Sequence, residues 1–379
     1  MVCIPRRSFC LSSTFVTALA GAALLVQGSP AARQVTVQES SFRPVVVQGE
    51  QEFAAEEYER AKRTFSKVID GARSIPGAQT DLANALNDLA EVYREWQRPA
   101  DARPLLEEAL AITQATSDNK LQIAVLNNSG MVFQLEGRLG EAENAFQRSL
   151  LKAAHEYGRE SLIYARILDN IGQLRIAEGK LSQAERQFRE SLRIRRQHAD
   201  PNGPEVAESL SSIAGIYAWR GQYAQADLLY GQALSATEKS LGANHLRTAA
   251  ILADLGLLSE QQHRFDQAEY FLKRALEIQQ AKLPPEHIDI ARTLRHIGNT
   301  LQALNRYEEA ASTLQRAVTI SRKAYSPNDI RLAATLETYA RVLEKLNKES
   351  EAAPFSDEAV RIRAYWSYRS PSSFTLWNK

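Results

Sequence analysis

Apolar and polar residues follow a pattern along most of this chain that returns at a nearly constant spacing. In each copy, a small residue is followed 12 positions later by an alanine, and large apolar residues stand four and eight positions after that alanine, except for Ser356 in the last copy. Steps of four place these positions on one stripe of a helix. Successive alanines are 40 positions apart in the first interval and 42 in the others: Ala102, Ala142, Ala184, Ala226, Ala268, Ala310 and Ala352.

Three further columns of this internal alignment describe a pair of helices. A leucine stands 16 positions before every alanine, and that invariance among the copies predicts a core position. Gly or Ala stands 12 positions before it, which predicts a close approach of two helices. The position five before it is mostly Gly or Asn, types that accept the left-handed backbone at a helix end. Each copy therefore predicts two helices joined by a short turn, and stacked copies complete each other's core.

These features resemble the tetratricopeptide repeat, in the 42-residue variety of the kinesin light chain. Leu241–His245 and Pro284–His287 are similar to that family's Leu-Gly-x-x-His-Pro connector, although Leu246 and Ile288 replace its proline. Their matching places make His245 and His287 structural in this interpretation. The resemblance implies an all-α, right-handed superhelical solenoid of about seven helix-turn-helix repeats over residues 81–365. It also implies recognition of proteins or peptides on the inner surface.

Segment 1–31 has the order of a secretory signal: Arg6 and Arg7, an apolar stretch from Phe9 to Val26, then small residues. The paired arginines also fit a twin-arginine signal. An uncleaved membrane anchor is the alternative, although an apolar stretch of this length, interrupted by Ser and Thr, is marginal for spanning a bilayer. Cys3 and Cys10, the only cysteines, lie inside this segment. We therefore expect a bacterial protein exported to the periplasm or secreted, without disulfides.

The segments that flank the repeats have their own predictions. Residues 32–49 lack helical periodicity and are interpreted as a tether. Residues 50–80 contain one amphipathic stretch, Glu50–Gly71, which predicts a single helix capping the open end of the solenoid. Residues 366–379 form an aromatic tail with Trp366 and Trp377. This tail either folds over the last repeat or contacts a partner or a second copy of the chain.

In the tetratricopeptide family the first helix of each repeat lines a concave groove. At its exposed positions stand Asn87, Asn127, Asn128, Asp169, Asn170, Trp219, Arg292, Arg295 and Asn299. The amides could pair with the backbone of an extended peptide, because each one both donates and accepts; the alternative is an ordinary solvated helix surface. Trp219 is either an apolar anchor beside small residues or is packed between repeats.

Charge along the groove suggests a direction for a bound segment. Arg292 and Arg295 of the sixth repeat could take a carboxylate, and Asp88, Glu91 and Glu95 of the first repeat are acidic. If all line one groove, a partner segment would be oriented by charge; chance surface composition is the alternative. Five arginines between Arg186 and Arg196 lie on a second helix and are interpreted as a solvated outer patch, with a phosphate site as the alternative.

Composition and motifs argue against other classes of function. The chain has 46 basic and 45 acidic side chains, so no net field attracts nucleic acid. It has no phosphate loop, zinc pair or nucleophile elbow, and the repeats leave no room for a catalytic domain. We expect a non-enzymatic protein- or peptide-binding scaffold or adaptor without cofactor or metal and with no membrane span in its mature chain. Alternatives are a regulatory module acting on an enzyme in trans and a protein that self-associates through its tail.

Overall fold

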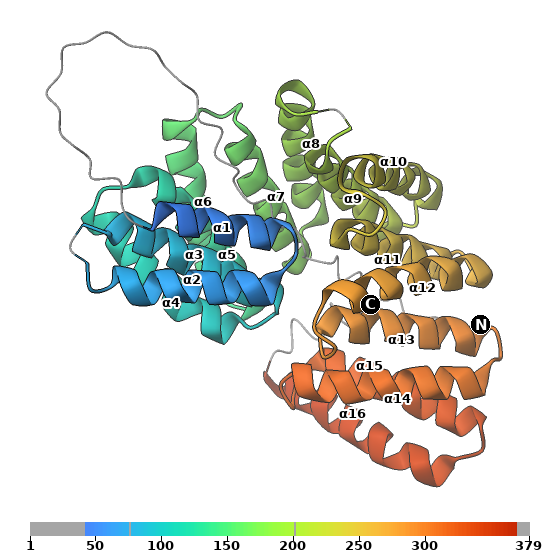
Figure 1. The fold of residues 1–379 in the computed structure, drawn as a ribbon. Coiled ribbons are helices and arrows are strands. Elements are labelled where there is room, and N and C mark those ends of the chain that lie inside the picture. The colour runs from blue at the N-terminus through green and yellow to red at the C-terminus, as the bar shows by residue number, and fades with distance from the viewer. Residues whose placement is uncertain (1–41, 76, 201, 370–379) are drawn as a thin grey trace, which may run out of the picture. The chain divides into compact units, whose positions relative to one another are not determined.

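The computed structural model describes residues 42–75, 77–200 and 202–369, and within these ranges the chain forms sixteen helices and no strand (Figure 1). The described chain divides into two compact units, which we treat separately: an N-terminal unit up to Leu174 and a C-terminal unit from Arg175. The predicted signal (1–31) and residues 370–379 of the predicted tail (366–379) lie outside the described residues, while residues 366–369 of that tail belong to the last helix. The all-helical repeat fold predicted from the sequence is confirmed.

The helices alternate between the first and second members of successive repeats. In order they are α1 (Arg43–Ala54), α2 (Tyr58–Ala72), α3 (Gln79–Glu95), α4 (Pro99–Ala115), α5 (Asn119–Leu135), α6 (Leu139–Glu156), α7 (Leu162–Ala177), α8 (Leu181–His198), α9 (Pro204–Trp219), α10 (Tyr223–Leu241), α11 (Leu246–Gln261), α12 (Phe265–Lys282), α13 (Ile288–Ala303), α14 (Tyr307–Ala324), α15 (Ile330–Lys345) and α16 (Glu349–Arg369).

The turn inside each repeat has one backbone conformation throughout the described chain. The residue five positions before the repeat alanine always has a positive φ, from 55° at Gln97 to 76° at Gly221. After this residue, the chain bonds back to the helix it has left: in the α5–α6 turn, Arg138 N–H donates to the carbonyl of Phe133. Gly and Asn accept this conformation readily, so the predicted turn column is confirmed.

The single capping helix predicted for residues 50–80 is wrong, because a complete helix pair, α1 and α2, precedes the first predicted repeat. Glu56 lies in the turn between the two helices and has a φ of 62°. Ala61 of α2 is fully buried at the place of the repeat alanine, and Gly49 packs on Phe65. The repeat was hidden because Val45 stands where the other copies have leucine. The tether prediction for 32–49 fails from residue 43, where α1 begins.

The small-residue column makes room for a large side chain on the second helix of the same repeat. A Cβ atom built on Gly130 would lie 2.6 Å from the ring of Phe146, and one on Gly298 would lie 2.4 Å from Leu314. Such distances are far inside van der Waals contact, so a side chain at Gly130 or Gly298 would displace the side chain of Phe146 or Leu314. The predicted close approach is confirmed, and what fills the space is the residue four positions after the alanine.

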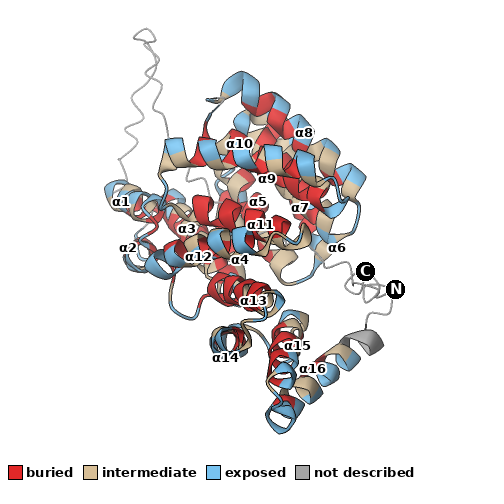
Figure 2. Cartoon of the chain, turned by 90° about the vertical axis from the view of Figure 1, so that its right-hand side faces the viewer, coloured by how far each residue is buried: buried red, intermediate tan, exposed pale blue. Residues whose placement is uncertain are grey.

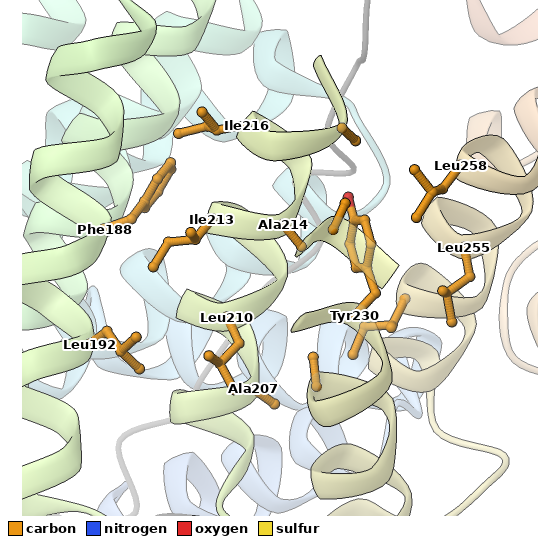
Figure 3. Close-up of a cluster of buried hydrophobic side chains, with 14 of the residues drawn as sticks. Phe188, Leu192, Ala207, Leu210, Ile213, Ala214, Ile216, Tyr230, Leu255 and Leu258 are labelled. Carbon is orange, nitrogen blue, oxygen red and sulfur yellow. The ribbon is translucent and has the colours of Figure 1, made fainter. Parts of the chain in front are cut away.

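The core of the C-terminal unit runs continuously from one repeat into the next. In Figure 3, Phe188 of α8, Ile213 of α9 and Tyr230 of α10 point into one apolar cluster that also receives Leu258 of α11. Each first helix thus packs against second helices on both of its sides, as expected for a solenoid. Val360 departs from its predicted core column and is 64% exposed, because no described helix follows α16 to cover it.

Burial differs between first and second helices. First helices such as α9, α11 and α13 are buried over most of their length, whereas α10, α12 and α14 keep a wide solvent face (Figure 2). The connector histidines are structural, as predicted: the Nδ1 atoms of His245 and His287 accept the N–H groups of Arg247 and Asp289, both at 3.1 Å, and so cap α11 and α13.

One arginine of the predicted solvated patch on α8 is not on the surface. Arg195 is 2% exposed, donates to the carbonyl of Glu205 and the hydroxyl of Ser209, and lies 3.3 Å from the carboxylate of Glu208. It falls on the stripe that faces α9, and burial with these partners makes it a packing residue. Its four companions are exposed as predicted. In the described part of the chain no helix is long and apolar enough to cross a bilayer.

Candidate partner-binding face

Polar side chains recur at one position on the first helices from α3 onward, and we call the side of these helices that carries them the first-helix face. Its defining column lies 14 positions before each of the seven repeat alanines, and all of its members are polar. They are Asp88, Asn128 and Asn170 in the N-terminal unit, and Ser212, Asp254, His296 and Thr338 in the C-terminal unit. Most of the residues predicted to bind a partner lie in this column or one position before it.

In the N-terminal unit, asparagine amides connect successive first helices. Asn128 of α5 donates to the Oδ1 atom of Asn87 on α3 at 2.9 Å and to the carboxylate of Glu91 at 2.7 Å. One repeat further on, Asn170 of α7 donates to Oδ1 of Asn127 on α5 at 2.7 Å. Each link spans two repeats, because an amide offers both a donor and an acceptor. The structure thus brings together four of the predicted site residues as one ladder.

The burial of these amides changes how they can act. Asn87, Asn127 and Asn128 are each at most 5% exposed, so their first partners are one another. Asn170 is partly exposed and offers its oxygen atom at the edge of the ladder. Asp169, the neighbouring predicted residue, is 3% exposed. Backbone recognition by these amides remains a prediction, and the ladder they form would hold the face in a fixed geometry.

Acidic groups of α3 and of the neighbouring helix α1 lie together where the face begins. Burial and the nearby carboxylate of Glu91 raise the pKa of Asp88 well above its ordinary value. Burial also raises the pKa of Glu50 on α1, although Arg43, 3.6 Å from it, opposes the shift. A carboxyl group with a raised pKa keeps its proton to a higher pH, and a cation placed beside it would favour the charged form. The acidic end predicted for the first repeat is therefore enlarged by a residue of α1.

The C-terminal unit places ionisable groups in the same column. Burial raises the pKa of Asp254 on α11 to about 7, and the guanidinium of Arg292 on α13 partly opposes this. Arg292 also bonds Asp289 in the first turn of its own helix at 2.7 Å. One of the two predicted carboxylate-binding arginines is thus engaged with carboxylates of the chain itself.

A second link between α11 and α13 is centred on His296. Its Nδ1 atom is 3.0 Å from the carboxylate of Glu260, whose other oxygen accepts the Thr300 hydroxyl at 2.8 Å. The Nε2 atom of the same ring lies 2.9 Å from a guanidinium nitrogen of Arg295. The imidazole therefore connects Arg295 to a carboxylate, and it holds that guanidinium at the surface of the unit.

The two remaining predicted residues lie in different environments. Both polar atoms of the Asn299 amide on α13 are shielded from solvent, and neither has a hydrogen-bond partner among the described residues. Trp219 ends α9 with 51% of its surface exposed, which argues against the packed alternative. Ser211 and Ser212, the small residues expected beside it, are buried.

Several residues on or beside the face were missed by the sequence interpretation. Glu50 and Arg43 were assigned to a cap and a tether, and Asp254 and Glu260 were not selected. For Asp254 a signal existed, because the column 14 positions before the repeat alanine is polar in all seven copies. The predicted acidic-to-basic gradient joins residues of both units and stays a prediction. Among the residues described, no group of three or more His, Cys, Asp or Glu side chains could hold a metal ion.

Comparison with known proteins agrees with this geometry. A family model described as tetratricopeptide repeat matches residues 47–115, 121–197, 205–281 and 289–364. The first match begins within α1, in agreement with the additional helix pair. The tetratricopeptide repeat protein 19 homolog, mitochondrial, of Drosophila melanogaster is 32% identical over 89 residues, which are 23% of this chain and 24% of that relative. The matched part thus spans about a quarter of the relative's length.

Solved structures are similar in fold. The crystal structure of a Rap protein complexed with competence and sporulation factor aligns with a TM-score of 0.58 and 12% identity, over 86% of this chain and 99% of that one. BtubC (BKLC) from P. vanneervenii aligns with a TM-score of 0.47 and 21% identity, over 62% of this chain and 94% of the other. A kinesin light chain-like repeat structure from Podosopora anserina gives 0.46 and 20% identity, over 54% and 98%.

Proposed function

Because the chain belongs to the tetratricopeptide repeat family, we propose that it is a non-enzymatic scaffold or adaptor that binds a protein partner along its first-helix face. Repeats of this family typically serve protein–protein interaction. The observation that carries the proposal is the column of polar residues repeated on every first helix from α3 onward, next to a buried leucine column. Of the column itself, Asp88 and Asn170 are partly exposed and could contact a partner segment directly, whereas its buried members would hold neighbouring groups such as Arg295 in place.

The two units offer different chemistry to such a segment. In the N-terminal unit, Asn170 and the carboxyl groups of Asp88 and Glu50 suit backbone N–H groups and basic side chains. In the C-terminal unit, Arg295 is oriented by His296 and suits a carboxylate. The partner we propose is an extended protein segment with basic and acidic residues, because both kinds of charge would find an opposite charge on the chain.

Site-specific photo-crosslinking tests this proposal. A photoreactive phenylalanine analogue would replace Met131 or Arg341, both one helical turn beyond the polar column on first helices. Matched controls carry it at Leu151 on α6 and Leu228 on α10, which are 70% and 62% exposed on second helices. We expect adducts with the same partner from the first pair only. Equal adducts from both pairs would contradict a first-helix binding face.

We also propose that the protein works outside the cytoplasm, in the periplasm or as a secreted protein. The support is the order of charged, apolar and small residues in 1–31. Sequencing the N-terminus of the protein purified from its native host tests this. We expect the chain to begin near residue 29 or 32; a soluble cytoplasmic protein that still begins at Met1 would contradict export.

A further inference from the structure

A cleft of about 390 Å³ opens in the N-terminal unit between α4, α5 and α6. Apolar side chains of all three helices line it, among them Leu106, Leu126 and Phe133. Its volume is in the range of small-molecule sites. Leu126 and Phe133 lie on a different face of α5 from Asn127, since each residue turns the helix by about 100°. The cleft is therefore separate from the first-helix face.

The sequence of the second predicted repeat explains why this cleft exists. Ser129 lines it and stands 13 positions before the repeat alanine. Each of the remaining six repeats from α3 onward has a buried Leu, Ile or Tyr at that position: Leu89, Ile171, Ile213, Leu255, Ile297 and Tyr339. The serine hydroxyl bonds its own helix, to the carbonyl of Val125 at 2.7 Å. The apolar volume that fills this place elsewhere is thus missing here.

A second small residue widens the same space. Ala145 on α6 lines the cleft, and its equivalents in the fifth and seventh repeats are Phe271 and Phe355. Gly140, at the start of α6, also lines the cleft, and a Cβ atom there would have nothing within 4 Å. Cores normally fill such spaces with side chains. Small residues at three lining positions of one repeat keep this one open.

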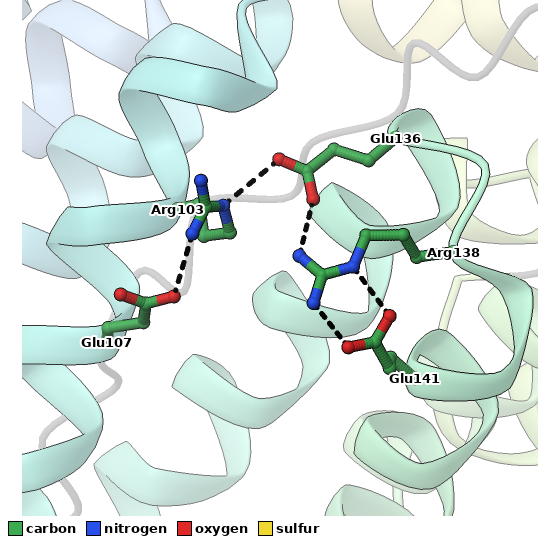
Figure 4. Close-up of polar contacts among 5 residues, drawn as sticks. All are labelled: Arg103, Glu107, Glu136, Arg138 and Glu141. Carbon is green, nitrogen blue, oxygen red and sulfur yellow. Dashed lines mark hydrogen bonds and ion pairs between the residues drawn. The ribbon is translucent and has the colours of Figure 1, made fainter.

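At the end of the cleft near the start of α6, three lining residues, Arg103, Glu107 and Glu141, take part in a network of ion pairs (Figure 4). Arg103 bonds Glu107 at 3.3 Å and Glu136 at 3.2 Å, and Arg138 bonds Glu136 at 2.9 Å and also Glu141. The network holds three carboxylates and two guanidiniums, so its charge is negative. A ligand's anionic group would be repelled from this end.

The other end of the cleft carries Arg148, seven positions along α6 from Glu141 and therefore about 10 Å away. Arg148 is exposed and makes no hydrogen bond or ion pair with any other described residue. Its equivalent in the fifth repeat, Arg274, bonds Glu238 of the preceding repeat at 2.6 Å. In the repeat that precedes Arg148, the residue equivalent to Glu238 is Gln114, which is uncharged. The acidic partner that the fifth repeat provides is therefore absent from this register position, and the Arg148 guanidinium can bind an anion from solution.

We propose that the cleft binds a small amphipathic carboxylate, with its apolar body between α4, α5 and α6 and its anionic group on Arg148. The distance from the ion-pair network to Arg148 fits a chain of about eight carbons or a fused pair of rings. Burial of the apolar body provides most of the affinity, and the guanidinium makes the cleft selective for an anionic group. The site is independent of partner binding on the first-helix face.

Competition binding on the purified protein tests the proposal. The fluorescent probe 8-anilinonaphthalene-1-sulfonate combines an apolar body with one anionic group, and calorimetry gives its stoichiometry. We expect one probe per chain, displaced by octanoate. Octylammonium has the same chain length and the opposite charge, and we expect it to compete at least about tenfold more weakly.

Three variants and one control locate the site. Ala145→Phe and Ser129→Ile place the side chains of other repeats into the cleft, and each should abolish displaceable binding. Arg148→Gln should weaken the binding of octanoate by about tenfold and leave the affinity for octylammonium unchanged. Arg196→Gln removes an equally exposed arginine from α8 and should change neither affinity.

Distinct outcomes would overturn the proposal. If octanoate does not displace the probe, the cleft is not a carboxylate site. If octanoate and octylammonium compete equally, the cleft is an apolar crevice without charge selection, better suited to a protein side chain. Unchanged octanoate affinity in Arg148→Gln would show that Arg148 does not bind the carboxylate. This last variant alters only an exposed side chain, so it decides the question even if the cleft-filling variants fail to fold.

Discussion

The two units use the same column of the repeat with different chemistry. In the N-terminal unit the column links helices through neutral amides, as in the bond from Asn170 to Asn127. In the C-terminal unit, it holds Asp254 near Arg292, and His296 against Glu260. An amide pair is buried without desolvating a charge, whereas an ionisable group needs a partner or a proton. Stability linked to pH should therefore be concentrated where the column is ionisable.

The largest expected effect comes from Asp254→Asn. The folded-state pKa of Asp254 is about 7 against an ordinary 3.8, so the folded state binds a proton that the unfolded state releases. The contribution of Asp254 to wild-type stability is then fully present below about pH 4 and is lost as the pH rises to 7, by up to about 4 kcal/mol. Urea unfolding at pH 5 and pH 8 should show a smaller loss in the variant. An identical loss in both proteins would contradict a buried, protonated Asp254.

Asp88→Asn extends this test to the N-terminal unit. The pKa of Asp88 is also raised, by burial and then by Glu91, so the same sign applies and wild-type stability falls as the pH rises through the raised value. Hydrogen exchange should locate the effect in α3 for this variant and in α11 for Asp254→Asn. If both substitutions changed exchange in the same helices, the two units would not respond separately.

Asn128→Ala should have the next largest effect. The substitution removes two hydrogen bonds and leaves the buried oxygen of Asn87 without its donor, which should cost about 2 kcal/mol. Hydrogen exchange should accelerate in α3 and α5, with no new dependence on pH. Asn144→Ala, an exposed asparagine on α6, is the control and should change stability by less than about 0.5 kcal/mol. Equal effects would mean that the amide ladder contributes no stability.

Glu260→Gln tests the histidine link and should have a smaller effect. Glutamine can still accept the Thr300 hydroxyl hydrogen bond, but it lacks the charge that faces His296. We expect a loss of about 1 kcal/mol, seen as faster exchange in α11 and α13. The variant should also weaken the binding of an acidic partner segment at Arg295, because the His296 ring that contacts Arg295 loses its charged partner. Unaltered exchange in both helices would show that this link is not stabilising.

The smallest effect is expected on the second helices, where the units are alike. Arg73 bonds Glu108 in the N-terminal unit at 2.7 Å, and Arg274 bonds Glu238 in the C-terminal unit at 2.6 Å. The Arg73 pair is exposed and the Arg274 pair is partly exposed, so Arg73→Gln should cost less than about 0.5 kcal/mol and Arg274→Gln less than about 1 kcal/mol, with smaller losses at high salt. A large loss in only one unit would show that the difference between units extends beyond the first-helix face.

The sequence could predict much of the fold because the same packing problem recurs at a fixed spacing. The Gly or Ala opposite Phe146 and Leu314, and the positive φ at residues such as His263 and Asn305, are local requirements that recur in each copy. The first helix pair escaped detection because Val45 replaces the diagnostic leucine, while Ala61 and Gly49 kept the pattern. Repetition thus compensates for the weakness of any single local signal.

The candidate site was predictable in position but not in chemistry. The sequence placed Asn127, Asn128, Arg292 and Arg295 on first helices. Their partners, Asn170, Glu91, Asp289 and His296, depend on how neighbouring repeats meet. Hydrogen bonds between side chains of successive repeats follow from the stacking distance of helices and from side-chain rotamers, which periodicity does not encode.

The sequence by itself determined the period, the helix pairs, the turn residues and the family, because each is a local property repeated along the chain. Only the tertiary structure decided which polar groups face each other, that Arg195 is buried, and that Ser129 and Ala145 leave a cleft instead of being compensated by larger neighbours. The physical reason is that burial and pairing are properties of the space between helices, and that space is shared by residues from different repeats.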